Sequence, residues 1–97
     1  MKNIIKKDIY TGWEHDHKLC SFYDVDVNKY IHIAHTESGR IQYIELCDIR
    51  DWKENEIFRA DGIIYLESVE TEDEEGNICL DIDSLAYYED KFTAVEF

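Results

Sequence analysis

The chain has 97 residues, of which 44% are hydrophobic and 13% aromatic, and its formal net charge is −13. This length suits one small folded domain, and the aromatic and hydrophobic content excludes a wholly disordered chain. The charge argues against direct binding to nucleic acid or to an anionic membrane, because both would repel the protein. We therefore expect a single compact domain, residues 1–97, whose partner is a basic protein.

The cysteines and the start of the chain predict a reducing compartment. Cys20, Cys47 and Cys79 are odd in number, lie far apart and form no CxxC pair. The first residues do not form an apolar signal segment. No run of about 18 apolar residues occurs, so no membrane span is predicted. We expect a cytoplasmic protein.

The first clear strand pattern is Lys18–Val27, where residues alternate with the period of two that is typical of a β-strand. Before it, Met1–Thr11 reads as either a short strand or a frayed lead-in. One face of the Lys18–Val27 strand carries Leu19, Ser21, Tyr23, Val25 and Val27. The alternation predicts that one face of this strand is mostly buried.

Two further strands are predicted around a tight turn. Tyr30–Thr36 forms the first, with Ile31 and Ile33 on one side. Glu37–Arg40 supplies the hairpin turn, in which glycine accepts a positive φ readily. Ile41–Ile49 has apolar residues on both faces, which predicts a central strand that is covered on both sides.

A helix is predicted over Asp51–Ala60. Asp51 is a suitable N-cap and Glu54 follows it three residues later, as in a capping box. Gly62 stands where a C-terminal cap would be. This stretch is the best helix candidate in the sequence.

The strongest strand pattern in the second half is Gly62–Glu70, and Thr71–Gly76 reads as the turn that follows it. Asn77–Asp83 is predicted to pair back on that strand. Its inward side chains would be Ile78, Leu80 and Ile82, and its outward ones Cys79, Asp81 and Asp83.

The end of the chain predicts a short helical turn and an edge strand. Asp83 or Ser84 would cap a turn through residues 85–88, and Phe92–Phe97 would form the strand. Taken together, these elements predict an α+β fold. It would be mainly an antiparallel β-sheet of five to seven strands with one or two short helices.

The acidic residues are unevenly distributed, which indicates an interaction surface. Residues 1–60 contain 11 acids and nine Lys or Arg, a net charge of −2, whereas residues 61–97 contain 12 acids and only Lys91, a net charge of −11. Ten acids fall in Glu67–Asp90, a segment without Lys or Arg. Protection of a sheet edge requires only one or two charges, so this density exceeds that requirement.

Within this segment, Asp81 and Asp83 are the strongest candidates for partner binding. Two residues apart on a strand, they would lie about 6.5–7 Å apart on one face. That spacing is comparable, within a factor of about two, with the charges along a nucleic-acid strand. Tyr87 and Tyr88 would add aromatic anchors. The predicted partner-binding residues are Glu70, Glu72, Asp73, Glu74, Glu75, Asp81, Asp83, Tyr87, Tyr88, Glu89 and Asp90.

No motif identifies a reaction, and neither a catalytic residue nor a cofactor is predicted. The sequence contains no P-loop, GxGxxG or GxSxG motif. His15 and His17 form an HxH pair, but zinc needs three or four converging ligands, and the spacing does not require convergence. An EF-hand calcium loop is excluded. With Gly76 at its sixth position, Thr71 and Ile82 would occupy the first and twelfth positions, where the motif needs an acidic oxygen ligand and a Glu.

We therefore expect a small acidic binding protein rather than an enzyme. It would inhibit a partner by occupying its basic nucleic-acid-binding surface, as a DNA mimic does, or by covering that surface. In size and acidity the chain resembles phage-encoded inhibitors of CRISPR and restriction enzymes, although this resemblance is one of composition alone. Two alternatives stay open: an immunity protein or antitoxin that neutralises a cationic nuclease toxin, and a metal-dependent enzyme that uses His15 and His17.

Overall fold

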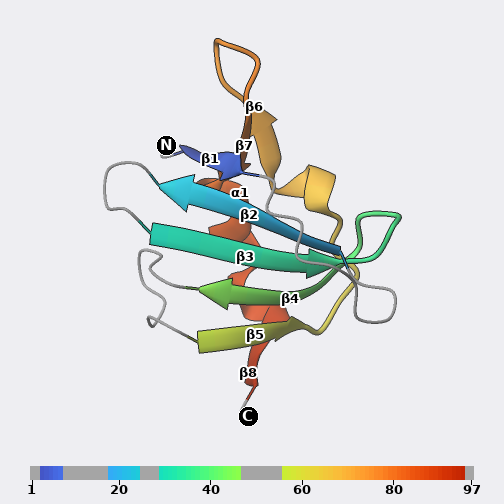
Figure 1. The fold of residues 1–97 in the computed structure, drawn as a ribbon. Coiled ribbons are helices and arrows are strands. Elements are labelled where there is room, and N and C mark those ends of the chain that lie inside the picture. The colour runs from blue at the N-terminus through green and yellow to red at the C-terminus, as the bar shows by residue number, and fades with distance from the viewer. Residues whose placement is uncertain (1–2, 8–17, 25–28, 47–55, 96–97) are drawn as a thin grey trace.

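The computed structural model describes residues 3–7, 18–24, 29–46 and 56–95, and these residues build an eight-stranded antiparallel sheet (Figure 1). The strand order is β6-β7-β1-β2-β3-β4-β5-β8. The strands are β1 (Asn3–Lys7), β2 (Lys18–Asp24), β3 (Lys29–His35), β4 (Ile41–Leu46), β5 (Glu56–Ala60), β6 (Glu70–Glu72), β7 (Ile78–Asp81) and β8 (Phe92–Val95). The helical elements are α1 (Ile82–Tyr87) and the 3-10 turns η1 (Leu66–Ser68) and η2 (Glu89–Lys91).

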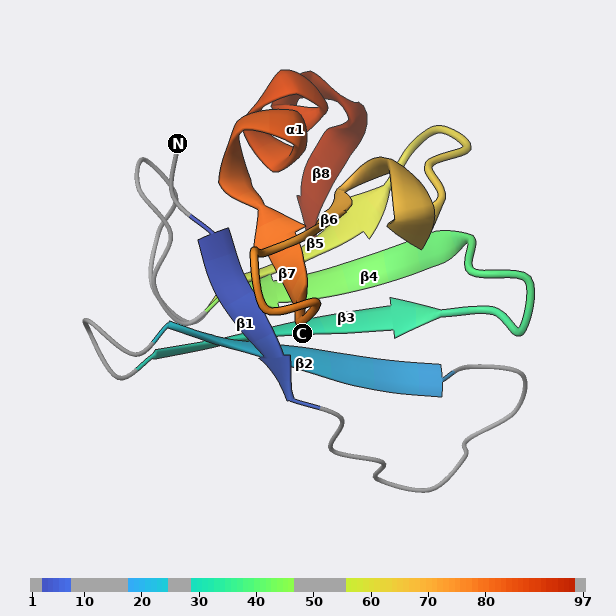
Figure 2. The same ribbon diagram turned by 90° about the horizontal axis from the view of Figure 1, so that it is seen from above.

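The predicted fold class is thus confirmed as a mainly antiparallel sheet with one short α-helix, and the strand number is slightly above the expected five to seven. Figures 1 and 2 show α1 on one face of the sheet, behind the central strands in the view of Figure 1. No helix among the described ranges is long and apolar enough to cross a membrane.

In β2, the core-facing side chains are Cys20 and Phe22, both buried in the main hydrophobic cluster. Leu19 and Tyr23 point to the opposite face and are only half-buried. The larger apolar set predicted for this strand is therefore not the one that faces the core. Its last members, Val25 and Val27, lie outside the described residues.

The faces of β4 are set by a bulge in its pairing with β3. Ala34 pairs with Tyr43 and His35 pairs with Ile41, so Gln42 is the extra residue. The bulge brings Ile41 to the core side together with Ile44 and Leu46. Tyr43 is exposed on the other face, so the prediction of a strand covered on both sides is wrong for the described part of β4.

The predicted helix Asp51–Ala60 is wrong over its second half, which forms β5. β5 pairs with β4 on one side and with β8 on the other. Its Phe58 packs against the core, while Ile57 and Arg59 belong to the opposite face of the sheet. Asp51 and Glu54, the residues that suggested capping, lie outside the described residues.

The predicted strand Gly62–Glu70 is mostly irregular. Ile64, Leu66 and Val69 are buried in the core cluster, so most of this stretch covers the sheet. It joins the sheet only at the isolated bridge between Arg40 and Tyr65 and at Glu70, where β6 begins. Two backbone bonds hold it against the turn before β4: the Ile41 amide donates to the Ile64 carbonyl at 2.8 Å, and the Leu66 amide donates to the Gly39 carbonyl at 2.7 Å. Gly39 itself has φ +88° in that turn, as predicted.

The strand predicted over Asn77–Asp83 ends at Asp81, where α1 begins. Leu80 and Ile82 are buried as expected, but Ile78 is 41% exposed and Cys79 is buried. α1 places Ile82 and Leu85 in the core, and η2 follows it. The chain then reaches the opposite edge of the sheet as β8, which confirms the edge strand over Phe92–Val95.

Candidate functional site

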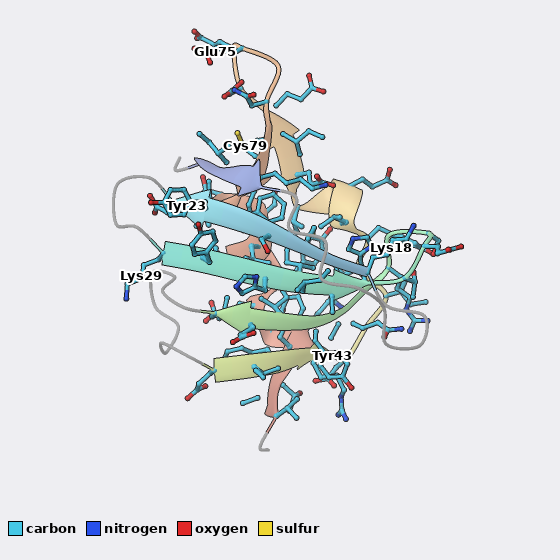
Figure 3. All side chains as sticks on the ribbon, viewed as in Figure 1. Lys18, Tyr23, Lys29, Tyr43, Glu75 and Cys79 are labelled. Carbon is cyan, nitrogen blue, oxygen red and sulfur yellow. The ribbon has the colours of Figure 1, made fainter. Side chains whose placement is uncertain are left out.

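The hairpin formed by β6 and β7 stands out from the rest of the sheet and carries exposed acids at its end (Figure 1). Glu72, Glu74 and Glu75 are all exposed, and Figure 3 shows Glu75 at the far end of the hairpin. We call these three residues the hairpin acids. All three belong to the predicted partner-binding residues, and they project into solvent.

Asp73 organises the turn beneath the hairpin acids. Its Oδ1 accepts hydrogen bonds from the backbone amides of Glu75 at 2.9 Å and Asn77 at 2.8 Å, and its Oδ2 accepts one from the Asn77 side chain at 3.1 Å. These bonds from Asn77 and Glu75 lower the pKa of the Asp73 carboxyl below its ordinary value of 3.8. Gly76 completes the turn with φ +85°. Asp73 therefore shapes the loop that presents its neighbours.

Glu70 anchors the base of the hairpin. Its Oε2 lies 3.5 Å from the Lys6 ammonium of β1, and both side chains are mostly buried. Although Glu67–Asp90 contains no base of its own, strand pairing brings one in from the start of the chain. Glu70 is thus an ion-paired residue at the hairpin base, and no local pattern in the sequence indicates its partner.

The predicted ladder of Asp81 and Asp83 on a strand is wrong. Asp81 is the N-cap of α1, and its Oδ1 accepts a hydrogen bond from the Asp83 amide at 3.1 Å. Its Oδ2 accepts a second from the Ser84 hydroxyl at 2.9 Å. Asp83 lies in the first turn of the helix and is exposed. The two carboxylates therefore differ in role: Asp81 stabilises the helix and Asp83 faces solvent.

The remaining predicted residues lie at the end of α1 and in η2. Tyr87 is 77% exposed, while Tyr88 packs against the core. Their rings meet edge to face, with centroids 5.1 Å apart. Glu89 and Asp90 are exposed in η2. Tyr88 supports the position of Tyr87, so only Tyr87 of the pair is available as an aromatic anchor.

The structure thus divides the predicted site between two places. The hairpin acids lie at the projecting tip, whereas Asp83, Tyr87, Glu89 and Asp90 lie on α1 and η2, behind the sheet in the view of Figure 1. Glu70, Asp73 and Asp81 support these elements and are not part of the solvent-facing acid. The hairpin and the helix therefore do not present a continuous row of evenly spaced carboxylates.

Sequence reasoning missed a hollow on the face of the sheet opposite α1. It has a volume of about 340 Å³ and is lined by Leu19, His32, Ala34, Tyr43, Glu45 and Ile57. Beside it, the Ser21 hydroxyl lies 2.7 Å from His32 Nδ1. Recognising these residues as one site requires the pairing of four strands, since they are spread from residue 19 to residue 57.

The described residues give no support for a metal site or for reactivity of the Cys79 thiol. Across the described ranges, no three His, Cys, Asp or Glu side chains are placed to hold a metal ion. His15 and His17, the predicted HxH pair, lie outside those ranges. Burial raises the pKa of the Cys79 thiol, and the nearby Asp73 carboxylate raises it further. A thiol in such surroundings stays protonated and is a poor nucleophile.

Comparison of the chain with protein-family models, with curated proteins and with solved structures finds no match.

Proposed function

We propose that this protein binds a basic surface of a partner protein through the hairpin acids. The single observation that carries the proposal is the projecting β6–β7 hairpin, whose exposed tip is acidic and whose turn is held by Asp73. A turn fixed by three hydrogen bonds presents its charges with less loss of conformational entropy on binding than a mobile tail. Asp83, Glu89 and Asp90 supply a second acidic contact.

The proposed consequence of binding is inhibition, because a basic surface of this kind commonly serves to hold nucleic acid. Covering it would exclude the nucleic acid from a CRISPR, restriction or other nucleic-acid-cleaving effector. The projecting hairpin favours insertion into, or coverage of, a basic groove. It does not favour strand-like mimicry of a phosphate backbone, since Asp81 caps a helix.

Two double charge reversals test the surface. One variant carries Glu74→Lys and Glu75→Lys at the hairpin tip, and the matched control carries Glu37→Lys and Glu67→Lys. All four glutamates are exposed, and the control pair lies in the turn before β4 and in η1. Asp73 is left unchanged so that the hairpin turn keeps its hydrogen bonds.

The partner is first isolated from the producing cells with the immobilised chain and identified by mass spectrometry. Binding of the purified partner is then measured by calorimetry at two salt concentrations. We expect the hairpin variant to lose at least about tenfold in affinity and most of the salt dependence, while the control loses much less. Equal losses in both variants would show that net charge, not the hairpin, governs binding.

Inhibition is tested with the same partner and its nucleic acid. Wild-type chain should release the nucleic acid from the partner in a gel-shift competition, and the hairpin variant should do so only at higher concentration. If the partner held chain and nucleic acid at the same time, the proposed coverage of the nucleic-acid surface would be wrong.

A further inference from the structure

The sheet face opposite α1 has an unusual surface for a solvated strand face. Strand register places Leu19, Ala34, Tyr43 and Arg59 in one row across β2 to β5, and Ser21, His32, Glu45 and Ile57 in the next. No helix or strand within the described ranges covers these rows (Figures 1 and 2). Apolar side chains on a sheet face that the described helices and strands leave uncovered are suited to form a binding site.

The hollow within this face combines apolar walls with one carboxylate. Leu19, Ala34 and Ile57 supply aliphatic surface, Tyr43 supplies an aromatic ring and Glu45 supplies the negative charge. Arg59, the cation in the adjacent row, is 3.3 Å from Asp61. Among the described residues, no cation forms an ion pair with Glu45. The hollow therefore contains a carboxylate that is available to a cation from outside.

The polar side of the hollow is held in place before any ligand arrives. The Ser21 hydroxyl, fully buried, lies 2.7 Å from His32 Nδ1, and the Tyr30 ring stacks on the His32 ring with 5.9 Å between centroids. A further ring contact joins Tyr30 to Tyr23 at 4.7 Å. These contacts restrict the rotation of His32, so its ring forms a fixed wall beside Glu45, its cross-strand neighbour.

The charge and shape of the hollow select the class of occupant. An anion would meet Glu45 and a chain of net charge −13. A purely apolar group would cover the Glu45 carboxylate without pairing it, which is unfavourable. An apolar stem that ends in a cation satisfies both the walls and the carboxylate. The volume of about 340 Å³ is at the low end of that of small-molecule sites, which suits a single long side chain.

We propose that the hollow binds an arginine side chain of the basic partner protein. The guanidinium would pair with Glu45 through parallel hydrogen bonds, while the methylenes contact Leu19 and Ile57. Lysine offers the stem and the charge but not the planar group. This inference rests on the proposed function for the basic nature of the partner, and adds a second surface apart from the hairpin.

Short peptides test the site without the partner. The probes are acetyl-Gly-Arg-Gly-amide and its lysine, citrulline and norleucine analogues, each titrated into ¹⁵N-labelled protein and followed by amide chemical shifts. Citrulline keeps the size of arginine and removes its charge. We expect saturable shifts at Leu19, Ala34, Tyr43 and Ile57 with the arginine peptide, and weaker binding with the lysine, citrulline and norleucine peptides.

Two variants place the binding at the hollow. Glu45→Gln removes the charge with almost no change of shape, and should weaken the arginine peptide by about two- to fivefold, as expected for an exposed ion pair. Ala34→Phe fills the hollow and should abolish the shifts while Glu45 remains. Glu37→Gln is the matched control, since it removes an exposed glutamate elsewhere and should leave binding unchanged. The dispersion of the amide spectrum verifies the fold of each variant.

The outcomes separate this inference from the proposed function. Equal binding of the arginine and norleucine peptides, or shifts centred on residues 72–75 instead of the hollow, would overturn the arginine site. Neither result would bear on the hairpin contact, which the charge-reversal variants test separately. Conversely, loss of the hairpin effect with saturable peptide binding at the hollow would refute the proposed hairpin contact and keep the arginine site.

Discussion

Asp73 and Asp81 show how identical side chains in one acidic segment acquire different roles. Each accepts hydrogen bonds from backbone or side-chain donors within four residues, and each thereby fixes a local structure, a turn in one case and a helix start in the other. Their neighbours Glu74 and Asp83 are exposed on the structures so formed. Substitutions at the supporting positions should therefore affect stability, and those at the exposed positions should affect binding.

For Asp73, the first prediction concerns pH. Its pKa is lowered in the folded protein by the bonds from Asn77 and Glu75, so the ionised form is the one that these bonds stabilise. The contribution to stability is present above the ordinary value of 3.8 and is lost as pH falls through the lowered value. Carboxyl NMR titration should place the Asp73 midpoint below 3.8. Asn77→Ala, which removes one donor, should move it upward.

A midpoint for Asp73 at or above its ordinary value would contradict the hydrogen bonding of the turn. The matched control is Asp73→Asn, which keeps the shape but cannot ionise. Its stability relative to wild type should be lower at neutral pH, and the difference should shrink as the solution is acidified.

The second prediction separates Asp81 from Asp83. Asp81→Ala removes the N-cap of α1 and should lower the free energy of unfolding by about 1 kcal/mol, within a usual range of about 0.5–2 kcal/mol. Asp81→Asn keeps an acceptor and should restore most of that loss. Asp83→Ala should have a smaller effect, because its side chain is exposed in the first turn. Urea denaturation measures all three, and a larger loss for Asp83→Ala would refute the assigned cap.

At the scale of elements, α1 is short but central to the core. With six residues it has too few turns to be stable alone, so packing must hold it on the sheet. Ile82 and Leu85 provide that packing, while Tyr87 faces solvent. The helix also carries the chain from β7 toward the far edge strand, so its detachment would loosen both ends of the sheet.

The third prediction follows from this placement. Leu85→Ala should lower the free energy of unfolding by about 2–5 kcal/mol, because it leaves a cavity beneath the helix. Tyr87→Ala, two residues later, should lower it by less than about 1 kcal/mol, since it removes one edge-to-face ring contact and little buried surface. Urea denaturation followed by circular dichroism compares the two. Similar losses would mean that α1 does not cover the core as described.

Elements whose signals are local were predictable from sequence. The alternation in β2 and β3, the turn at Gly39 and the edge strand β8 all depend on short-range pattern and backbone preference. β5 was not, because capping residues at Asp51 and Glu54 resemble a helix start, whereas its strand state comes from pairing with β4 and β8. Tertiary pairing of this kind overrides local propensity.

The candidate site was predictable only in part for the same reason. The sequence shows where acids are dense, but the Lys6 partner of Glu70 and the capping by Asp81 depend on which elements meet. The apolar run Gly62–Glu70 reads as a strand, although burial alone explains it. The hollow around Glu45 is formed by residues from four strands, so no single stretch of sequence contains its pattern.

At the scale of the whole molecule, the net charge of −13 bears on stability as well as on the proposed binding. Like charges repel within the compact state, and dissolved salt screens that repulsion. Raising sodium chloride from about 0.01 M to about 0.15 M shortens the screening length from about 30 Å to about 8 Å. The fourth prediction is a rise in Tm over this range by differential scanning calorimetry.

Potassium fluoride at matched ionic strength is the control, because it separates screening from binding of a particular ion. The Glu74→Lys and Glu75→Lys double variant, whose net charge is smaller, should show a shallower rise. A Tm that is constant or falls with salt would show that ion pairs such as Lys6 with Glu70 outweigh the general repulsion.

The position of β1 between β2 and β7 has a consequence for synthesis of the protein. β1 is synthesised before the other described strands and pairs with β2, which follows soon afterward. Its second neighbour, β7, comes much later in the sequence, as the pairing of Ile4 with Leu80 shows. Such distant pairings form slowly. The acidic hairpin is completed by that same late strand, so a nascent chain that ends before Ile78 cannot present it. The proposed binding through the hairpin would thereby be restricted to chains whose sheet is already assembled.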